Sequence, residues 1–271
     1  MVDSCGGTSS SLSEQSSKFE GEYFDSVAQE YHRLIREACY EIDFDILVRY
    51  VDIASCSGIL DLACGTGKFS LGILRRTAFP VVYAVDVSQQ MLAIARRGCE
   101  NEGMGHRLVT IKADLCAMPF GPAAFDAAVM GYAFHHIAAS KRLSVLQGIA
   151  GSVRTGGHVA IFEIGRLHFI QVIDLCYEDS SIMNGLPSPA EVEQLMSSVG
   201  LNVVCSMARR EYQWLPLDYV AQYCSIQGVV SDDAWSILKL LRNNLSDPAI
   251  ITNDRFVCVA SKPESFGHPS P

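Results

Sequence analysis

The sequence predicts an α/β protein built on a doubly wound, Rossmann-like sheet of seven mostly parallel strands with helical cap insertions. Two observations lead to this fold class: predicted strands and helices alternate, and the first strand runs into a glycine-rich turn, DLACGTGKFS, at residues 61–70. Alternation of this kind is typical of parallel strands joined by right-handed crossovers. The expected strands are 58–63, 81–86, 107–113, 125–132, 157–163, 201–208 and 255–261, and the expected helices are 68–77, 88–100, 140–154 and 188–199.

The first and last helical regions are marked by different signals. Residues 1–17 are rich in serine and glycine, and we expect them to be a disordered tail. The helix over 188–199 has Ser188 as its cap, Pro189 in its first turn and Glu191 to complete a capping box. A helix is also expected after the tail, because these apolar residues recur at helical spacing: Tyr31, Leu34, Ile35, Ala38 and Ile42.

Two stretches, 165–187 and 215–250, interrupt the alternation of strands and helices. Both contain aromatic residues and partly helical patterns. Together with residues 18–50 they are expected to cover the open end of the sheet as a cap. The sequence thus predicts one domain over residues 18–262, followed by a C-terminal tail at 263–271.

Composition limits the classes of partner and the compartment. The 271 residues are 49% hydrophobic and 19% charged, which is typical of a globular chain, and the net charge is −9. An acidic surface argues against nucleic acid as the main partner. The ten cysteines show no metal-ligand spacing, and no signal peptide or membrane span is recognisable. We therefore expect a cytoplasmic monomer or homodimer with no metal and no membrane partner.

The glycine turn suggests a cofactor that contains a nucleoside. Gly65 and Gly67 would let the backbone approach a ligand, and Asp86 ends the second strand, where a carboxylate can accept hydrogen bonds from a ribose diol. The nicotinamide fingerprint needs a third glycine, but Ser70 stands there. A P-loop needs a hydroxyl after its lysine, but Phe69 stands there. Both phosphate-binding interpretations are therefore weak.

The segment ILDLACGTGKFS resembles motif I of the class I methyltransferases that use S-adenosylmethionine. Four further segments agree with this family in order and spacing: VVYAVDVSQQMLAIAR, IKADLCAMPF, FDAAVMGYAFHHI and GSVRTGGHVAIFE. The resemblance covers about residues 20–210, and Ala63 replaces the first glycine of the usual pattern. It implies that the domain transfers a methyl group from S-adenosylmethionine to a small or medium organic acceptor by in-line displacement.

The resemblance also implies which residues bind the cofactor. The glycine turn is expected to hold the methionine end, Asp86 the ribose and Asp114 the adenine amino group. Acidic residues suit this ligand, because its sulfonium and ammonium outweigh its carboxylate. The implied cofactor residues are Asp61, Ala63, Gly65, Gly67, Asp86, Val87, Met91, Asp114, Leu115, Gly131 and Tyr132.

Catalysis is expected to rest mainly on alignment of the reactants. Alignment can supply roughly 7–11 kcal/mol, against roughly 3–5 kcal/mol for a general base. His135 and His136, in AFHHI, are the candidate bases, because histidine titrates near neutrality. Alternatively, this pair packs beside the cofactor. Glu163, at the end of the fifth strand, is expected to face the same cavity and bind a cationic acceptor or orient a base, or else to have a supporting role.

The acceptor pocket is expected to be shaped by aromatic residues of the cap, whose alternative role is ordinary packing. A second hypothesis is a cyclase-like enzyme that binds the cofactor without transferring methyl. Methylation of RNA or protein is a third, which the acidic balance disfavours. Arsenite methylation would need a trio of thiols such as Cys64, Cys176 and Cys224, without a local motif. The aromatic candidates are Tyr23, Tyr31, Phe169, Tyr177, Trp214 and Tyr223.

Overall fold

The computed structural model describes residues 9–35, 40–117, 120–165, 186–215 and 249–264, with the backbone alone for residues 9–20, 212–215 and 249–253. Its strands are β1 (Gly58–Leu62), β2 (Val81–Asp86), β3 (Leu108–Lys112), β4 (Phe125–Gly131), β5 (Val153–Ile164), β6 (Asn202–Leu215) and β7 (Ala249–Ser261). Its long helices are α1 (Ser9–Ile35), α2 (Glu41–Val51), α3 (Lys68–Arg76), α4 (Gln89–Asn101), α5 (Ala139–Ser152) and α8 (Pro189–Ser198).

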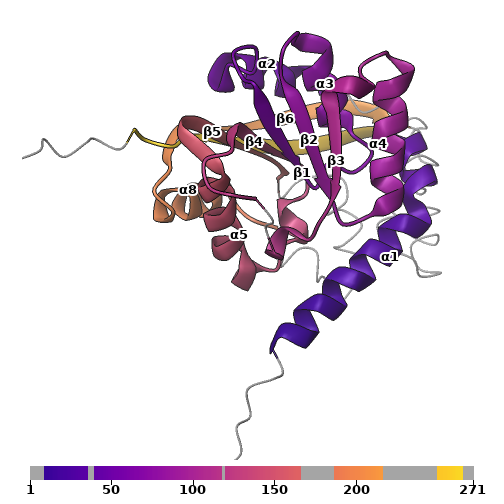
Figure 1. The fold of residues 1–271 in the computed structure, drawn as a ribbon, viewed down its shortest axis with the longest axis horizontal. Coiled ribbons are helices and arrows are strands. Elements are labelled where there is room, and N and C mark those ends of the chain that lie inside the picture. Colours follow the sequence, from indigo (N-terminus) through magenta and orange to yellow (C-terminus); the bar gives the residue numbers. More distant parts are fainter. Residues whose placement is uncertain (1–8, 36–39, 118–119, 166–185, 216–248, 265–271) are drawn as a thin grey trace, which may run out of the picture.

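The strands form one sheet in the order β3-β2-β1-β4-β5-β7-β6 (Figure 1). Strands β1 to β5 run parallel, whereas β7 is antiparallel to both neighbours, β5 and β6. The chain builds from β1 outward to β3 and then returns to place β4 on the other side of β1. This reversal creates a switch point at the carboxyl ends of β1 and β4, where open α/β sheets bind ligands. The fold class predicted from the sequence is confirmed.

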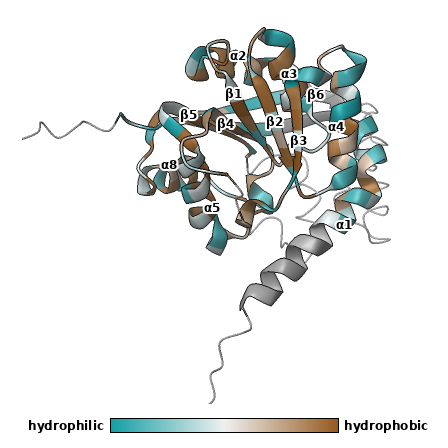
Figure 2. Cartoon of the chain, viewed as in Figure 1, coloured by the Kyte–Doolittle hydropathy of each residue, from teal (hydrophilic) through white to brown (hydrophobic). Residues whose placement is uncertain are grey.

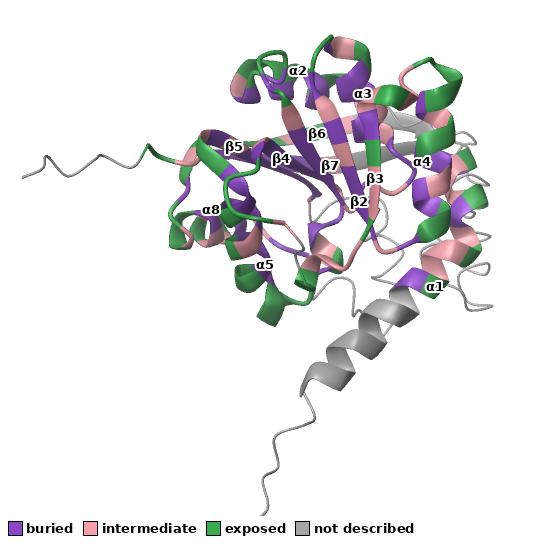
Figure 3. Ribbon diagram, viewed as in Figure 1, coloured by how far each residue is buried: buried purple, intermediate pink, exposed green. Residues whose placement is uncertain are grey.

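Apolar cores cover both faces of the sheet. Successive side chains of a strand point to opposite faces, so Ile59 packs with Phe44 of α2, whereas Leu60 packs with Leu146 of α5. The strands are correspondingly apolar along the middle of the sheet (Figure 2) and mostly buried (Figure 3). Two cores of this kind hold the strand ends, and therefore the switch point, in a fixed position.

Strands β6 and β7 extend further than the expected ranges, 201–208 and 255–261, and they pair with each other along this extension. Charged residues hid the extension in the sequence. Arg210, for example, lies directly opposite Asp254, and its guanidinium donates to that carboxylate over 2.7 and 3.0 Å. A cross-strand ion pair of this kind allows charged residues to remain in a strand.

The N-terminal region differs from the expectation in two ways. Helix α1 begins at Ser9, so residues 9–17 have helical backbone where a disordered tail was expected. The stretch contains no proline that would break a helix. Helix α2, inside the expected cap of residues 18–50, buries Phe44 and Leu47 in the core and is therefore part of the scaffold.

The other two cap segments, 165–187 and 215–250, lie almost entirely outside the described residues. At the end of the first, the predicted helix start is confirmed: the Ser188 hydroxyl accepts from the backbone N–H of Glu191 at 3.1 Å, and α8 follows. None of the helices in the described part of the chain is long and apolar enough to span a bilayer.

Candidate cofactor and active site

The turn between β1 and α3 is built from left-handed backbone. Ala63, Gly65 and Gly67 have φ values of 50°, 52° and 80°. The turn is tied to the end of β2, because the backbone N–H of Gly65 donates to Asp86 Oδ2 at 2.8 Å. This arrangement brings the glycine turn and the carboxylate that ends β2 to one place.

The two glycines of the turn have different surroundings. A Cβ on Gly65 would meet no atom within 4 Å, and Gly65 lines the cavity described below. A Cβ on Gly67 would lie 2.7 Å from the Cβ of Ala95 on α4. Gly67 is thus required for the close packing of α3 on α4, and it is not part of the cavity lining.

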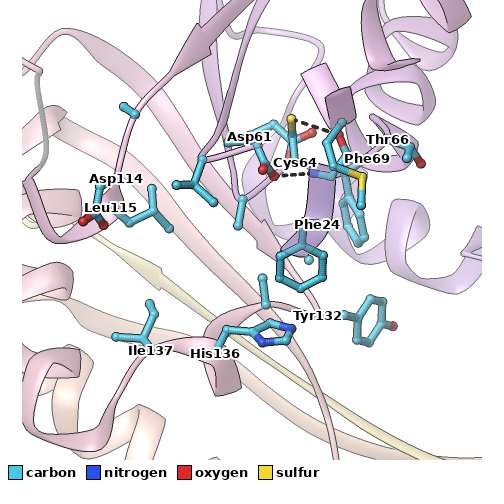
Figure 4. A pocket seen from close by; sticks show the side chains of 18 of the residues that line it. Phe24, Asp61, Cys64, Thr66, Phe69, Asp114, Leu115, Tyr132, His136 and Ile137 are labelled. Atoms are coloured by element: carbon cyan, nitrogen blue, oxygen red, sulfur yellow. Dashed lines mark hydrogen bonds between the residues drawn. The ribbon is translucent and has the colours of Figure 1, made fainter. Parts of the chain in front are cut away.

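A cavity of about 600 Å³ opens at the switch point, a size within the usual range for binding sites of organic ligands. Figure 4 shows Asp114 and Leu115 on one side, Asp61 and Thr66 on another, and His136 on a third. Residues of the sequence prediction that line it are Tyr31, Asp61, Ala63, Gly65, Asp86, Val87, Met91, Asp114, Leu115, Gly131, Tyr132 and His136. The structure thus brings most of the predicted cofactor residues together.

Two buried carboxylates form the acidic part of the lining. Asp61 is 1% exposed and accepts from the Ser70 hydroxyl at 2.5 Å, and burial raises its pKa to about 7. Asp86 accepts from the backbone N–H groups of Gly65 at 2.8 Å and Ser88 at 2.9 Å, and burial also raises its pKa. The charge of Asp86 also raises the pKa of Asp61, so a cationic ligand beside the two carboxylates would favour their ionised forms.

Two further polar groups line other sides of the cavity. Asp114 accepts from the backbone N–H of Cys116 at 2.8 Å and so begins a 3₁₀ turn, Leu115–Ala117. Thr66 is 6% exposed, and its Oγ1 is buried without a hydrogen-bond partner among the described residues. A buried hydroxyl in this state favours a ligand that can bond to it.

His136 is the histidine that lines the cavity. Its ring makes an edge contact with Phe24 of α1, with ring centres 5.5 Å apart and planes at 89°. The His136 side chain is exposed to the open cavity, but the protein groups around it replace much of its water and, with a smaller effect of His135, lower its pKa well below its usual value. The imidazole is therefore neutral near pH 7 and keeps one ring nitrogen able to accept a proton.

His135 and Glu163 form a separate buried pair. The Nδ1 atom of His135 lies 2.9 Å from Glu163 Oε1, and its backbone N–H donates to Oε2 at 2.8 Å. The backbone N–H of Ile164 also donates to Oε1, at 2.6 Å. Glu163 is fully buried and neither residue lines the cavity, which differs from the expectation that Glu163 faces it. The backbone donors turn the carboxylate inward.

The aromatic lining differs in part from the expected set. Tyr31 lines the cavity, whereas Tyr23 does not and packs edge-on against Phe24. Phe24, Tyr40 and Phe69 line it although the sequence analysis missed them. Phe24 stands at helical spacing from Tyr31, so the apolar pattern of α1, followed further back, would have found it. Three of the expected aromatic residues lie outside the described residues, namely Phe169, Tyr177 and Tyr223. For Trp214 the structure describes only the backbone.

A buried ionic cluster lies behind the cavity wall. The Tyr132 hydroxyl donates to Asp43 Oδ2 at 2.7 Å, and Arg209 of β6 binds the other oxygen of Asp43. Arg255 of β7 lies 3.9 Å from Asp43 and 3.6 Å from Glu211. Local sequence patterns carry no signal for this cluster, because its members come from distant parts of the chain.

Comparisons with known proteins agree with this geometry. A family profile described as "Methyltransferase domain" matches residues 59–157. The demethylmenaquinone methyltransferase of Thermus thermophilus is 28% identical over 207 residues, which is 66% of this chain and 91% of the relative. The 2-phytyl-1,4-naphtoquinone methyltransferase of Nostoc punctiforme is 30% identical, and the match spans 45% of this chain and only 53% of that relative.

Solved structures show the same fold. The cyclase SpnF is similar with a TM-score of 0.63 at 16% identity, over 91% of this chain and 97% of that one. A phosphoethanolamine N-methyltransferase of Haemonchus contortus, solved with S-adenosyl-L-methionine, has a TM-score of 0.59 at 18% identity, over 90% of this chain and 58% of that one. Together, the sheet order, the profile and the curated relatives support the resemblance to the class I S-adenosylmethionine-dependent methyltransferases that the sequence predicts.

Proposed function

We propose that this chain methylates a small or medium organic acceptor, with S-adenosylmethionine as the methyl donor. One observation carries the proposal: a cavity of about 600 Å³ at the switch point combines buried carboxylates with an aromatic wall. The carboxylates suit a cationic cofactor, and the wall suits an apolar organic acceptor.

The residues of the cavity fit the cofactor. Gly65 leaves open space where any other residue would place a Cβ, and the unpartnered Thr66 hydroxyl can bond to the methionine end. Asp61 lies beside this end and would offset the ammonium. On the other side of the turn, Asp86 has a second lone pair on each oxygen for the ribose diol, and Asp114 would accept from the adenine amino group. Val87, Met91 and Leu115 supply the apolar contacts around the base.

The reaction needs alignment more than acid–base chemistry. When bound, the cofactor supplies an electrophilic methyl group on its sulfonium. Gly131 and Tyr132 would form the floor beside that group, while the aromatic wall orients the acceptor and excludes water. His136, neutral and in the lining, would accept the proton that the acceptor loses. The buried pair of His135 and Glu163 would hold the neighbouring backbone and ring in place.

An aromatic-ring acceptor is the finer form of the proposal. Among the described residues, five aromatic rings from four parts of the chain line the cavity: Phe24, Tyr31, Tyr40, Phe69 and Tyr132. Aromatic rings pack favourably against one another in edge or offset geometry, so a planar acceptor would gain contacts here. The Thermus and Nostoc relatives are named for quinone-type acceptors, which supports testing hydroquinones first.

Two alternatives remain as outcomes of the test. The first is a cyclase-like enzyme that binds the cofactor without using its methyl group; the cyclase SpnF shares the fold of this chain. RNA or protein methylation has less support, because the chain has a net charge of −9 and a nucleic-acid partner calls for clustered basic residues.

The test combines binding with turnover. We expect S-adenosylhomocysteine to bind in calorimetry, and label from methyl-labelled S-adenosylmethionine to appear on a hydroquinone or another small phenol from a panel. His136→Gln should lower turnover while leaving cofactor affinity nearly unchanged, and His106→Gln, at an exposed position, serves as the matched control. Binding without any labelled product across the panel and a metabolite extract would favour the cyclase-like alternative. An absence of binding would reject the proposal.

A further inference from the structure

The buried cluster behind the cavity wall connects Tyr132 to the far edge of the sheet. Tyr132 follows β4 and lines the cavity, while its hydroxyl donates to Asp43 of α2 at 2.7 Å. Arg209 of β6 binds the other oxygen of Asp43 and also donates to the Tyr132 hydroxyl at 3.3 Å. Burial raises the pKa of Tyr132 well above its usual value, so the hydroxyl stays protonated and remains a donor.

Two arginines and two carboxylates balance the charge of the cluster. Arg209 and Arg255 lie directly opposite each other on β6 and β7, an arrangement that repels unless anions separate the charges. Asp43 is fully buried between them, and Glu211 lies 2.7 Å from Arg209 and 3.6 Å from Arg255. Buried ion pairs of this kind add little net stability compared with apolar packing, so stability alone is a poor explanation for the cluster.

The geometry of Tyr132 offers a better explanation. Its φ of 58° is a left-handed conformation that carries about 1–2 kcal/mol of strain for a residue with a side chain. The surroundings must therefore impose this conformation. The guanidinium of Arg255 also lies 5.1 Å from the centre of the Tyr132 ring and 5.5 Å from that of Tyr40, two rings that line the cavity. The cluster thus holds the two aromatic side chains from behind.

We propose that Asp43 is a positioning residue of the cofactor site, which acts by tethering the Tyr132 hydroxyl and so fixing the aromatic floor of the cavity. The proposal rests on the function proposed above, because it assigns the floor to the reactive end of the cofactor. Asp43 does not line the cavity and would not touch the ligand. Its influence on binding must therefore pass through Tyr132.

A double-mutant cycle tests this route, with S-adenosylhomocysteine as the probe and calorimetry as the readout. Asp43→Asn keeps the shape of the side chain but removes its charge, and Tyr132→Phe removes the tethered hydroxyl. Each single change should weaken binding about 2- to 10-fold, the range that corresponds to one hydrogen bond. In the Tyr132→Phe background, Asp43→Asn should cause no further loss of affinity.

The melting temperature supplies the contrasting readout. Asp43→Asn should lower it in both backgrounds, because Asp43 also pairs with Arg209. The matched control is Asp254→Asn, which breaks the exposed ion pair with Arg210 on the same two strands and should leave binding unchanged. If Asp43→Asn fails to fold, Tyr132→Phe alone decides the matter: normal binding by that variant overturns the tether.

The remaining outcomes separate the two proposals. Equal losses of affinity from Asp43→Asn in both backgrounds would show that Asp43 acts through general packing, which overturns the inference and leaves the proposed function intact. Unchanged binding by both Asp43→Asn and Tyr132→Phe has the same meaning. If the unaltered protein does not bind S-adenosylhomocysteine, the proposed function fails, and this inference fails with it.

Discussion

Asp61 and Asp86 share the same corner of the cavity, and each is more than nine-tenths buried. Their hydrogen bonds come from a hydroxyl and from backbone N–H groups, which only partly offset the loss of water. Burial therefore raises the pKa of both carboxylates, and the charge of Asp86 further favours the neutral form of Asp61. A ligand with an ammonium group would favour their ionised forms.

The affinity for S-adenosylhomocysteine should depend on pH through Asp61. Its pKa is about 7, and the ligand's ammonium favours the ionised carboxylate. Below about pH 7, Asp61 must lose its proton when the ligand binds. The dissociation constant should therefore increase by up to about tenfold for each pH unit by which the pH is lowered, and it should not change with pH above pH 8. Calorimetry from pH 5.5 to 8.5 measures this, and Asp61→Asn should bind more weakly with no such slope. A slope that persists in Asp61→Asn would assign the proton to another group.

Asp61 should make the ligand-free protein less stable as the pH rises, whereas it makes ligand binding tighter. The folded-state pKa of Asp61 lies above its ordinary value of 3.8, so the folded state retains a proton that the unfolded state has lost. The contribution of Asp61 to the free energy of unfolding is therefore largest near pH 4 and falls as pH rises toward about 7. Urea unfolding of the wild type and of Asp61→Asn across this window separates this contribution from those of other carboxylates.

Thr66→Val should weaken S-adenosylhomocysteine binding without reducing stability. Valine has nearly the same shape as threonine, and the buried hydroxyl that it replaces has no partner among the described residues. Loss of one hydrogen bond to the ligand corresponds to about 0.5–1.5 kcal/mol, or roughly a 2- to 10-fold weaker affinity. Removal of an unsatisfied buried group should leave the melting temperature equal or higher. Unchanged affinity would mean that Thr66 does not meet the ligand.

Among the elements, the turn between β1 and α3 separates two functions that look alike in the sequence. Gly65→Val should abolish S-adenosylhomocysteine binding, because the side chain would enter the open cavity, and should lower the melting temperature only by the strain of its left-handed backbone. Gly67→Val should lower the melting temperature further, because the same strain is joined by a collision of its Cβ with Ala95 on α4. Circular dichroism and calorimetry of both variants test the distinction. A fully stable Gly67→Val protein would contradict the packing assignment.

One carboxylate of helix α1 adds polar contacts to the apolar cluster that packs the helix on α4. Asp25 accepts from the Ser88 hydroxyl at 2.5 Å and from the backbone N–H of Gln90 at 2.9 Å, at the start of α4. Asp25→Ala should therefore loosen α1, raise hydrogen exchange of residues 21–35 and weaken S-adenosylhomocysteine binding through Phe24. Glu30→Ala, on the exposed side of the same helix, is the matched control. If hydrogen exchange of residues 21–35 is equal in the wild type and in Asp25→Ala, α1 does not depend on Asp25 for its position.

At the scale of the whole molecule, the predictable features were those that depend on local sequence. The alternation of strands and helices, the glycine turn and the Ser188 cap are short-range patterns, and the structure contains all three. The packing of Gly67 against Ala95 depends on where a second helix lies. The inward turn of Glu163 depends in part on the backbone N–H of His135, which belongs to another loop. The contact of Asp43 with Arg209 joins residues far apart in the chain, which no local pattern encodes.

The melting temperature of the protein should rise with S-adenosylhomocysteine. A ligand at about 100 times its dissociation constant adds roughly 2.7 kcal/mol to the free energy of unfolding. For a chain of this size that corresponds to a rise of roughly 5–10 °C, with a logarithmic dependence on concentration. Scanning calorimetry measures the shift, and NAD should give none, because the nicotinamide fingerprint is incomplete. An equal shift with NAD would count against the cofactor assignment.

Because the switch point lies between β1 and β4, the binding site is complete only when β1 has paired with both β2 and β4. Its lining is gathered from α1, from the ends of β1, β2, β3 and β4, and from the start of α5. Any intermediate that has paired β1 with β2 but not with β4 has half of the lining and no floor. Such an intermediate gains nothing from the ligand, so S-adenosylhomocysteine should slow unfolding without speeding the early steps of refolding.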